Sequence, residues 1–442
     1  MLIGLAIRLI YIGVHDRRIE PFSDAFWYHG GANFLADGHG FIDPISFELE
    51  GTKLPGAGHP PGYIMALAIP SVLGFTSVLA HQVWSAFLST TMTGAVGLLG
   101  RRLAGNRAGL VAACLAAVYP NFFVYDALLA SESLVLPCVA ITLLAAYWFW
   151  ERPSGRRAAI LGVSCGVTAL ARSETIVLLV LLVLPCCAFL RQLSVRRRAA
   201  LLSAAGVSAL AVIAPWAVFN LLRFERPVLL STPDHTLLAG NCPEVYEGDH
   251  IGFFTISCLL EASCPDGTDD AAECLLRTEP GGDASTQALV FRRAALENMR
   301  ENLGDLPRVV LAREGRAFGF FRPGQQLVID QLSSKEIELS RVALAMYYAL
   351  VVGFVAGAVV LRRRGTPVFP LFAPIAGVAL AVSMTFGETR YRAVAEVPLA
   401  VGAAVAIDAA LSRRQDVRKG RLAPRRHGCD GDEPVAAVGA AK

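Results

Sequence analysis

The chain begins with MLIGLAIRLIYIGV (residues 1–14), and after seven further residues it continues with FSDAFWYHGGANFLADGHGFIDP (residues 22–44). The first string is apolar apart from Arg8, whereas the second holds three aspartates and two histidines among aromatic and small residues. Ionisable residues beside a membrane segment mark a functional site by default. We therefore interpret the first string as a membrane helix and the second as one wall of a site outside it.

The composition is that of a membrane protein with many crossings. Of the 442 residues, 54% are hydrophobic and 17% are charged, and the mean hydropathy is +0.49. Soluble domains carry about 25% charged residues. Several apolar runs are also long enough to cross a bilayer. The sequence therefore predicts an all-α polytopic membrane protein.

About ten apolar runs are expected to cross the membrane. Residues 1–14 reach only about 21 Å as a helix, against a hydrocarbon core of about 30 Å. A cleaved signal peptide is the alternative, but no Ala-x-Ala-like site follows, so we expect a first transmembrane helix whose start lies upstream. The run after HPPGY (residues 59–63) ends near Leu73 and is too short to span, so we expect an interfacial helix there. The expected spans are 1–14, 78–100, 108–125, 134–150, 158–171, 175–190, 199–219, 341–361, 367–386 and 392–411.

Basic residues gather in blocks near residues 101–107, 152–157, 191–198, 362–364 and 413–419. Each block flanks an apolar run, so the positive-inside rule explains the blocks better than nucleic-acid binding does, and no nucleic-acid partner is expected. Both termini are then expected in the cytoplasm. The membrane that the chain crosses is expected to be the plasma membrane. The polar segments 15–60, 126–133, 172–174, 220–340 and 387–392 all emerge on the outer face. We expect one extracytoplasmic site assembled from them.

The chain divides into four parts. Residues 1–219 form an N-terminal membrane module whose first outer loop (15–77) carries the site, 220–340 an extracytoplasmic loop region, 341–411 the last membrane helices and 412–442 a disordered cytoplasmic tail. Outside the cell, cysteines form disulfides. We expect two disulfides in the loop region, and three pairings are open. The candidates are Cys242, Cys258, Cys264 and Cys274.

Asp24 is the candidate catalytic base. Ser23 is a good N-cap, which places Asp24 in the first turn of a helix on which Tyr28 shares its face. The helix dipole favours the ionised carboxylate, and that carboxylate could accept a proton from an attacking hydroxyl. The alternative is that Asp24 only strengthens the start of the helix.

Further charged residues lie where the outer surface is expected. Glu132 precedes a membrane run and needs a partner or an aqueous cavity, unless it caps the helix with Ser131. Arg172 and Glu174 interrupt two apolar runs and could simply pair with each other.

The last outer segment is FGETRYR (residues 386–392). It carries two arginines on the outer face, although the positive-inside rule places basic residues on the cytoplasmic side. Arginine suits bidentate recognition of phosphate. Other outer-face residues extend this pattern, namely Asn220, Arg223, Arg226, Arg313, Arg316 and Arg322.

Histidines of the first outer loop raise the question of a metal. His29, His39 and His59 could bind a divalent ion together with Asp24. Their spacing matches no compact metal motif, so histidines with ordinary hydrogen bonds at the membrane interface are favoured.

The order of these features resembles the GT-C superfamily of integral-membrane glycosyltransferases, in the branch of protein O-mannosyltransferases and lipid A aminoarabinose transferase. The resemblance covers nearly all of the chain to about residue 411. It rests on Ser23-Asp24-Ala25, Tyr28-His29, Leu35 to Phe41, the HPPGY of 59–63, Ser131-Glu132-Ser133, Ala171 to Glu174, Pro215-Trp216 with Asn220, and the GETRYR of 387–392. No piece is specific alone; their order and their placement in loops carry the match.

The resemblance implies a GT-C fold and a polyprenyl-phosphate-linked sugar as donor. The acceptor would be a hydroxyl of a cell-envelope glycan, a glycolipid or a protein. The Asp of the family's first outer loop matches Asp24, which implies attack with inversion, while arginines such as Arg390 and Arg392 stabilise the leaving phosphate. Several members have paired acidic residues where this chain has Asp24 alone, so no cofactor is assigned and a divalent metal stays open.

Together these arguments predict Asp24 and Glu132 as catalytic residues. The predicted substrate-binding residues are Tyr28, His29, His59, Tyr63, Arg172, Asn220, Glu388, Arg390, Tyr391 and Arg392. A polyprenyl-lipid or glycolipid flippase is the main alternative, but it should carry ionisable groups deep in several spans or repeated broken helices. A non-catalytic membrane scaffold is the third possibility, and it predicts that Asp24 is replaceable.

Overall fold

The structure, a computed structural model, describes residues 1–15, 18–20, 23–232, 234–263 and 282–418. These residues form helices joined by short connections, with no β-sheet among them. The all-α polytopic architecture predicted from the sequence is confirmed.

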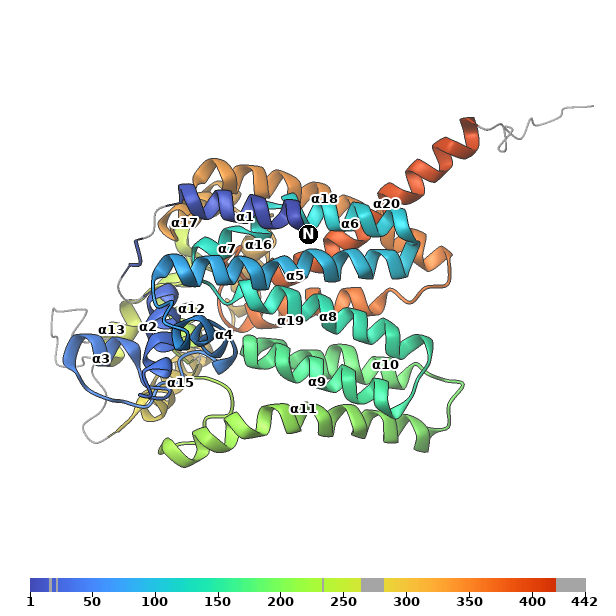
Figure 1. Ribbon diagram of the computed structural model, residues 1–442. Helices are drawn as coiled ribbons and strands as arrows, with labels where there is room; N and C mark the ends of the chain where they lie inside the picture. Colours follow the sequence, from blue (N-terminus) through green and yellow to red (C-terminus); the bar gives the residue numbers. More distant parts are fainter. Residues whose placement is uncertain (16–17, 21–22, 233, 264–281, 419–442) are drawn as a thin grey trace, which may run out of the picture.

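Long helices run side by side and form the body of the molecule (Figure 1). Smaller helices gather at one end of this bundle, at the left of the figure, and include α2, α3, α4, α12, α13 and α15. The bundle helices are α1 (Leu2–Val14), α5 (Val78–Ala104), α6 (Asn106–Val118), α8 (Glu132–Glu151), α9 (Gly155–Ala171), α10 (Leu184–Ala188), α11 (Val195–Arg223), α18 (Ile337–Arg363), α19 (Phe369–Met384) and α20 (Ala393–Arg418).

Five of the described helices are long and apolar enough to cross a membrane, namely α5, α8, α11, α18 and the part of α20 up to Gln415. Shorter apolar helical segments occupy Leu2–Val14, Pro61–Val72, Asn106–Val118, Ser173–Ala188 and Phe369–Met384. The helices coincide in position with the runs expected from the sequence, while the number of about ten crossings stays a prediction.

The connections that carry the basic blocks lie together at the end of the bundle opposite the small helices (Figure 1). Arg102 at the end of α5 forms an ion pair with Glu151 at the end of α8, at 2.6 Å. Arg107 at the start of α6 contacts Asp408 of α20 at 2.7 Å. The basic connections and the polar outer segments therefore occupy opposite ends of one bundle, as the positive-inside argument requires.

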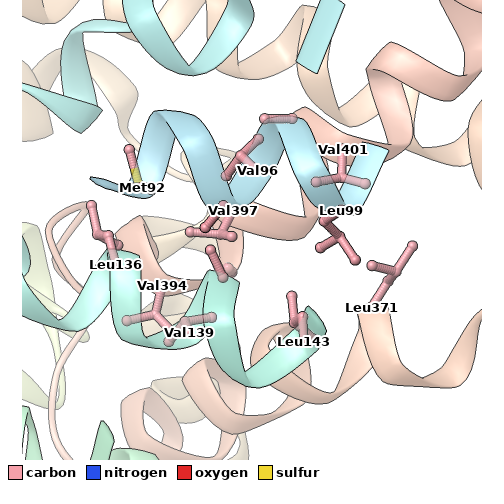
Figure 2. Packing of buried hydrophobic residues seen from close by; sticks show 14 of the residues in the cluster. Met92, Val96, Leu99, Leu136, Val139, Leu143, Leu371, Val394, Val397 and Val401 are labelled. Atoms are coloured by element: carbon pink, nitrogen blue, oxygen red, sulfur yellow. The ribbon is translucent and has the colours of Figure 1, made fainter. Parts of the chain in front are cut away.

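The core lies where α5, α8, α19 and α20 meet. Figure 2 shows Met92, Val96 and Leu99 of α5 facing side chains of α8 and of α20. The partners drawn there are Leu136, Val139, Leu143, Leu371, Val394, Val397 and Val401. In a membrane, helix association depends on close packing rather than on removal from water.

Glycines allow the closest helix crossing. A Cβ placed on Gly357 of α18 would lie 1.9 Å from the carbonyl oxygen of Gly402 of α20. The two backbones therefore touch at this point, which the small-residue spacing of Gly353 and Gly357 permits.

The first outer loop folds into three helices, α2 (Asp24–Ala36), α3 (Pro44–Glu50) and α4 (Pro61–Val72). The Ser23 hydroxyl accepts a hydrogen bond from the Phe26 backbone N–H at 3.2 Å, so the predicted N-cap is confirmed. Residues of α4 such as Ile64 and Leu67 pack against Tyr28 and Ala32 of α2. The opposite face of α4 exposes Met65 and other apolar residues, as a helix in contact with lipid requires.

The segment between α11 and α18 also lies at this end of the bundle. Its helices are α12 (Asp234–Gly240), α13 (Ser257–Ser263), α15 (Ala284–Glu301), α16 (Leu306–Ala317) and α17 (Pro323–Leu332). A disulfide joins Cys242 to Cys258. The other two disulfide candidates, Cys264 and Cys274, lie outside the described residues.

Irregular helix follows α9. The chain leaves α9 at Arg172 and continues as a 3₁₀ segment, Ser173–Val177, then a π-helical segment, Leu179–Val183, before α10. Irregular backbone at membrane depth is tolerated where it is buried in protein or lines a cavity. Segments of π-helix are frequent at functional sites.

Candidate functional site

Asp24 lies at the start of α2 and faces the last outer segment. Its Oδ2 is 2.7 Å from Nη1 of Arg390, and its Oδ1 is 3.4 Å from Nε2 of His59. The side chain keeps 37% of its surface accessible. The carboxylate is therefore positioned by two partners and still open to a substrate.

Arg390 joins Asp24 to a second carboxylate. Its Nε donates to Oε1 of Glu132 at 2.7 Å, and its Nη2 donates to Oε2 of the same residue at 3.1 Å. This is the two-bond geometry in which guanidinium and carboxylate pair most strongly. All three guanidinium nitrogens of Arg390 thus contact a carboxylate.

Glu132 is the centre of the arrangement. Its side chain is fully buried at the start of α8, and a second guanidinium, that of Arg172, also donates to it. The Ser131 side chain makes no capping hydrogen bond there, so the alternative that Glu132 merely helps to cap α8 finds no support. Arg172 in turn binds Glu174. We call this series of alternating charges the ion-pair chain, and it consists of His59, Asp24, Arg390, Glu132, Arg172 and Glu174.

Electrostatics hold this chain in its ionised form. Desolvation alone would raise the pKa of Asp24, but the nearby Arg390 and His59 outweigh it and hold that pKa well below its usual range. Desolvation likewise acts to lower the pKa of Arg390, and Glu132 and Asp24 reverse this and raise it. Asp24 is therefore a carboxylate at neutral pH, and a weak proton acceptor.

Aromatic side chains frame the ion-pair chain. The Tyr28 ring lies 4.7 Å from the His59 ring and 4.9 Å from the Tyr63 ring. The Tyr63 hydroxyl shares a 2.7 Å hydrogen bond with Ser85 of α5. On the other side, Arg172 lies over the Tyr391 ring at 5.2 Å. These four predicted residues, Tyr28, His59, Tyr63 and Tyr391, thus lie around the charges.

Comparison with known proteins agrees with this architecture. A family model described as dolichyl-phosphate-mannose-protein mannosyltransferase matches residues 58–219, which run from just before α4 into α11. No curated protein sequence matches the chain. The structure is similar to the archaeal oligosaccharyltransferase AglB from Archaeoglobus fulgidus, in complex with an inhibitory peptide and a dolichol-phosphate, with a TM-score of 0.52 and 14% sequence identity.

The alignment with AglB covers 96% of this chain and 52% of AglB, so the chain spans about half the length of that protein. ArnT from Cupriavidus metallidurans, bound to undecaprenyl phosphate, is also similar, with a TM-score of 0.42, 14% identity and coverage of 96% of this chain and 81% of ArnT. The fold is that of the GT-C glycosyltransferases. The resemblance read from the sequence is confirmed at this level.

Within the GT-C fold, three predicted substrate-binding residues lie away from the ion-pair chain. His29 contacts His81 of α5, with 3.0 Å between the two Nδ1 atoms. Asn220 is buried in α11, where its Oδ1 accepts hydrogen bonds from Arg223. Arg392 binds Glu396 at 2.6 Å and lies over the Tyr347 ring. Each has a partner inside the protein that accounts for its position.

The arginines of the long outer segment also have internal partners. Arg313 donates to the carbonyl oxygens of Gly240 and Ser383, at 2.6 Å and 2.8 Å. Arg316 donates to the Ile251 carbonyl oxygen at 2.6 Å. Both side chains are fully buried. Arg313 fastens this segment to α19 through Ser383, whereas Arg316 joins parts of the segment to one another.

A buried ion pair beside the site escaped the sequence reasoning. Lys335, just before α18, contacts Asp330 at 2.9 Å, and Thr389 donates to the same carboxylate at 3.0 Å. Electrostatic interaction links Lys335 to Glu388. In the sequence, Asp330 and Lys335 lie five residues apart and directly before an apolar run. Such a pair of charged residues resembles an exposed loop.

A metal site is not assembled from the residues considered for one. The His39 ring lies 5.0 Å from the Phe47 ring, whereas His29 contacts His81 and His59 contacts Asp24. Among the described residues, no group of three or more His, Cys, Asp or Glu side chains is arranged to hold a metal ion. Asp24, His29, His39 and His59 are thus not brought together as a metal site, and we derive no step through a metal.

Proposed function

We propose that this chain transfers a sugar from a polyprenyl-phosphate-linked donor to an acceptor hydroxyl on the extracytoplasmic face of the plasma membrane. The observation that carries the proposal is the position of Arg390 and Arg172. Arg172 pairs with Glu174 and lies over the Tyr391 ring, and both of these residues line an apolar cleft. Arg390 pairs with the accessible carboxylate of Asp24. A lipid-linked phosphate diester needs such a combination of cations and apolar surface.

The apolar cleft lies between the irregular segment after Arg172 and α19. Glu174 and Tyr391 stand at its polar end, and Val177, Leu178 and Val378 line its apolar part. The hydrocarbon chain of a lipid packs favourably against such an apolar surface. The GT-C neighbour AglB was solved with a dolichol-phosphate, which supports a polyprenyl chain as the occupant.

The phosphate would bind to the arginines by exchanging partners. In the free protein Arg172 is paired with Glu132 and with Glu174. Glu174 is the more exposed of the two carboxylates, with 34% of its side chain accessible, so the phosphate displaces it more readily. Arginine offers the planar, two-bond geometry that phosphate oxygens prefer.

The reaction would proceed with inversion. The acceptor hydroxyl attacks the anomeric carbon while the bond from that carbon to the phosphate oxygen breaks. Polyprenyl phosphate gains negative charge as it leaves, and Arg390 and Arg172 stabilise that charge. Asp24 is the carboxylate at the reacting atoms: it accepts a hydrogen bond from the hydroxyl, orients it for attack and takes up its proton as the new bond forms.

The acceptor would approach from the outer segments. The His235 side chain of α12 interacts electrostatically with His59 and Asp24, which places α12 beside the site. The disulfide between Cys242 and Cys258 fixes the connection that follows α12. An envelope glycan, a glycolipid or a protein would be recognised by this segment.

A deletion strain tests the proposal. We expect loss of one class of cell-envelope glycan or glycolipid, or of one protein glycosylation, with the unused polyprenyl-phosphate sugar accumulating. Wild-type protein should restore the product, and Asp24→Asn should not, although it reaches the membrane in equal amount. An unchanged set of glycans, or full restoration by Asp24→Asn, would argue against the function or against Asp24. If the chain were instead a flippase, its deletion should leave the donor on the cytoplasmic leaflet, and its activity should depend little on Asp24.

A further inference from the structure

Asp126 is a buried carboxylate that lies beside the site without belonging to the ion-pair chain. It is in α7 (Val124–Ala127), and its Oδ2 lies 3.2 Å from Nε of Arg8 in α1. Both side chains are fully buried, so bulk water reaches neither charge. An ionisable residue within a membrane helix, such as Arg8, is costly and marks a functional position by default.

Two serine hydroxyls donate to the Asp126 carboxylate. Ser89 of α5 donates to Oδ2 at 2.6 Å, and Ser133 of α8 donates to Oδ1 at 2.7 Å. Arg8 also donates to the Ser89 hydroxyl, at 2.8 Å. The carboxylate thus joins three helices, α1, α5 and α8. Of these contacts, the bond from Ser133 leads to the site, because Ser133 is the residue after Glu132.

The connection between Asp126 and Ser133 is short and held in place. Gln82 of α5 donates to the Ala127 carbonyl oxygen at 2.7 Å. Leu129 has a φ of 49°, a left-handed conformation that is uncommon for a residue other than glycine. Such conformations persist where the surrounding contacts impose them, and they cluster at functional sites. The hydrogen bond from Ser133 to Asp126 closes the connection across Leu129.

The direction of the Glu132 side chain depends on this connection. Glu132 is the first residue of α8, and its two oxygens accept hydrogen bonds from Arg390 at 2.7 Å and 3.1 Å. Arg172 donates to the same carboxylate. The start of α8 is fastened to Asp126 by the next residue, Ser133. A shift of the start of α8 would therefore move both arginines.

We propose that Asp126, through the Ser133 hydroxyl, is a positioning residue for the two arginines that stabilise the leaving phosphate. This rests on the glycosyl transfer proposed above. Asp126 touches no reacting atom in this role: it fixes the start of α8 and thereby Glu132, which holds the arginines. Arg8 compensates the charge of Asp126, so the first membrane helix belongs to the same support. Misplacing reacting groups by about 1 Å can cost on the order of 10²-fold in rate.

The alternative is that Asp126 only holds the helices together. The two serines separate these roles, because each gives one buried hydroxyl to the same carboxylate. If Asp126 only stabilises the fold, Ser89→Ala and Ser133→Ala should lower the melting temperature alike and leave the activity of the folded protein unchanged. If Asp126 positions the arginines, Ser133→Ala should also lower the activity and Ser89→Ala should not.

The test compares these two variants as purified full-length proteins, with polyprenyl-phosphate-linked sugars as donors and the rate expressed per mole of folded protein. Ser133→Ala should lower kcat by about 10- to 10²-fold, although its melting temperature should match that of Ser89→Ala. Ser133→Thr keeps the hydroxyl and should restore most of the rate. Ser89→Ala should keep the wild-type kcat.

The outcomes separate the two proposals. Equal kcat values in Ser133→Ala and Ser89→Ala would overturn the positioning role and leave the transferase assignment standing. Absence of transfer by the wild type with every polyprenyl-phosphate sugar would overturn both. If Ser133→Ala fails to reach the membrane, Ser133→Cys decides, because a thiol occupies similar space and donates only weakly. A lowered kcat in Ser133→Cys supports the role, and a wild-type kcat contradicts it.

Discussion

Arg390 uses all three of its guanidinium nitrogens on carboxylates that come from distant parts of the chain, Asp24 and Glu132. Such a group is costly to bury alone and stable only when paired. Removing one partner leaves charge uncompensated. The ion-pair chain should therefore respond to single substitutions far more strongly than the exposed pairs at the other end of the bundle.

Glu132→Gln should destabilise the protein. Glu132 is fully buried and serves two arginines, so its loss should lower the free energy of unfolding by about 3–5 kcal/mol. Glu151→Gln is the matched control, because it breaks an exposed pair with Arg102 that is worth about 0–1 kcal/mol. Denaturant unfolding in detergent micelles measures both. Equal effects of the two substitutions would contradict the central position of Glu132.

Asp24 should give stability a defined dependence on pH. Its pKa is lowered in the folded protein, so the ionised form stabilises the fold above the ordinary aspartate pKa of about 3.9, and this contribution is lost as the pH falls through the lowered value. The difference in melting temperature between wild type and Asp24→Asn should persist at neutral pH and shrink on acidification. A difference that grows as the pH falls would show that Asp24 is not held ionised by its neighbours.

At the scale of elements, α4 and the end of α9 bring the first outer loop against Arg172. A Cβ on Gly62 would lie 2.5 Å from the carbonyl oxygen of Leu170, so the two backbones are in contact. The glycine of the HPPGY stretch is thus required by packing. The position of Tyr63 and His59 relative to Arg172 follows from this contact.

Gly62→Ala should push α4 away from α9. We expect a loss of about 1–3 kcal/mol in stability from overpacking and a parallel loss of transfer activity. Gly206→Ala in α11 is the control, since a Cβ there meets no atom within 4 Å, and it should be neutral or slightly stabilising. The melting temperature and the transfer rate of both variants decide this. A Gly62→Ala protein that matches Gly206→Ala would show that the contact is not needed.

The sequence predicted individual helices and their ends better than the contacts between them. The cap at Ser23, the short helix after Pro60 and the break at Arg172 follow from capping rules, apolar run length and charge, which are local. Contacts between elements were harder. Asn220 and Arg392 looked like phosphate ligands because of their place on the outer face, yet partners on their own helices or on neighbouring ones hold them inside the protein.

For the whole molecule, the placement of charged residues in the sequence correctly predicted which segments gather at each end of the bundle. The basic connections gather at one end of the bundle, and the ion-pair chain lies at the other end, among segments that are hundreds of residues apart in sequence (Figure 1). Sequence reasoning grouped these segments by topology alone. The pair of Arg172 with Glu174 was expected from their adjacency in the chain. Pairs between distant segments depend on side-chain geometry, and therefore the contact of Lys335 with Asp330 was not predicted.

Labelling of single cysteines tests the orientation. Glu247→Cys in the long outer segment should react in intact cells with a membrane-impermeant maleimide, whereas Arg156→Cys in the first turn of α9 should react only after the cells are opened. Both positions are exposed. The unsubstituted protein gives the background from its own cysteines. Labelling of Arg156→Cys in intact cells would invert the topology and remove the site from the outer face.

We propose that this GT-C fold cleaves a polyprenyl-phosphate sugar at the site of Asp24 and Arg390. The most direct measurement is the release of polyprenyl phosphate by the purified protein from a panel of polyprenyl-phosphate-linked sugars, with membranes of the deletion strain as the source of acceptor. We expect release from at least one donor by the wild type, and a fall in that release of about 10²-fold or more in Asp24→Asn. No release from any donor, or equal release by Asp24→Asn, would contradict it.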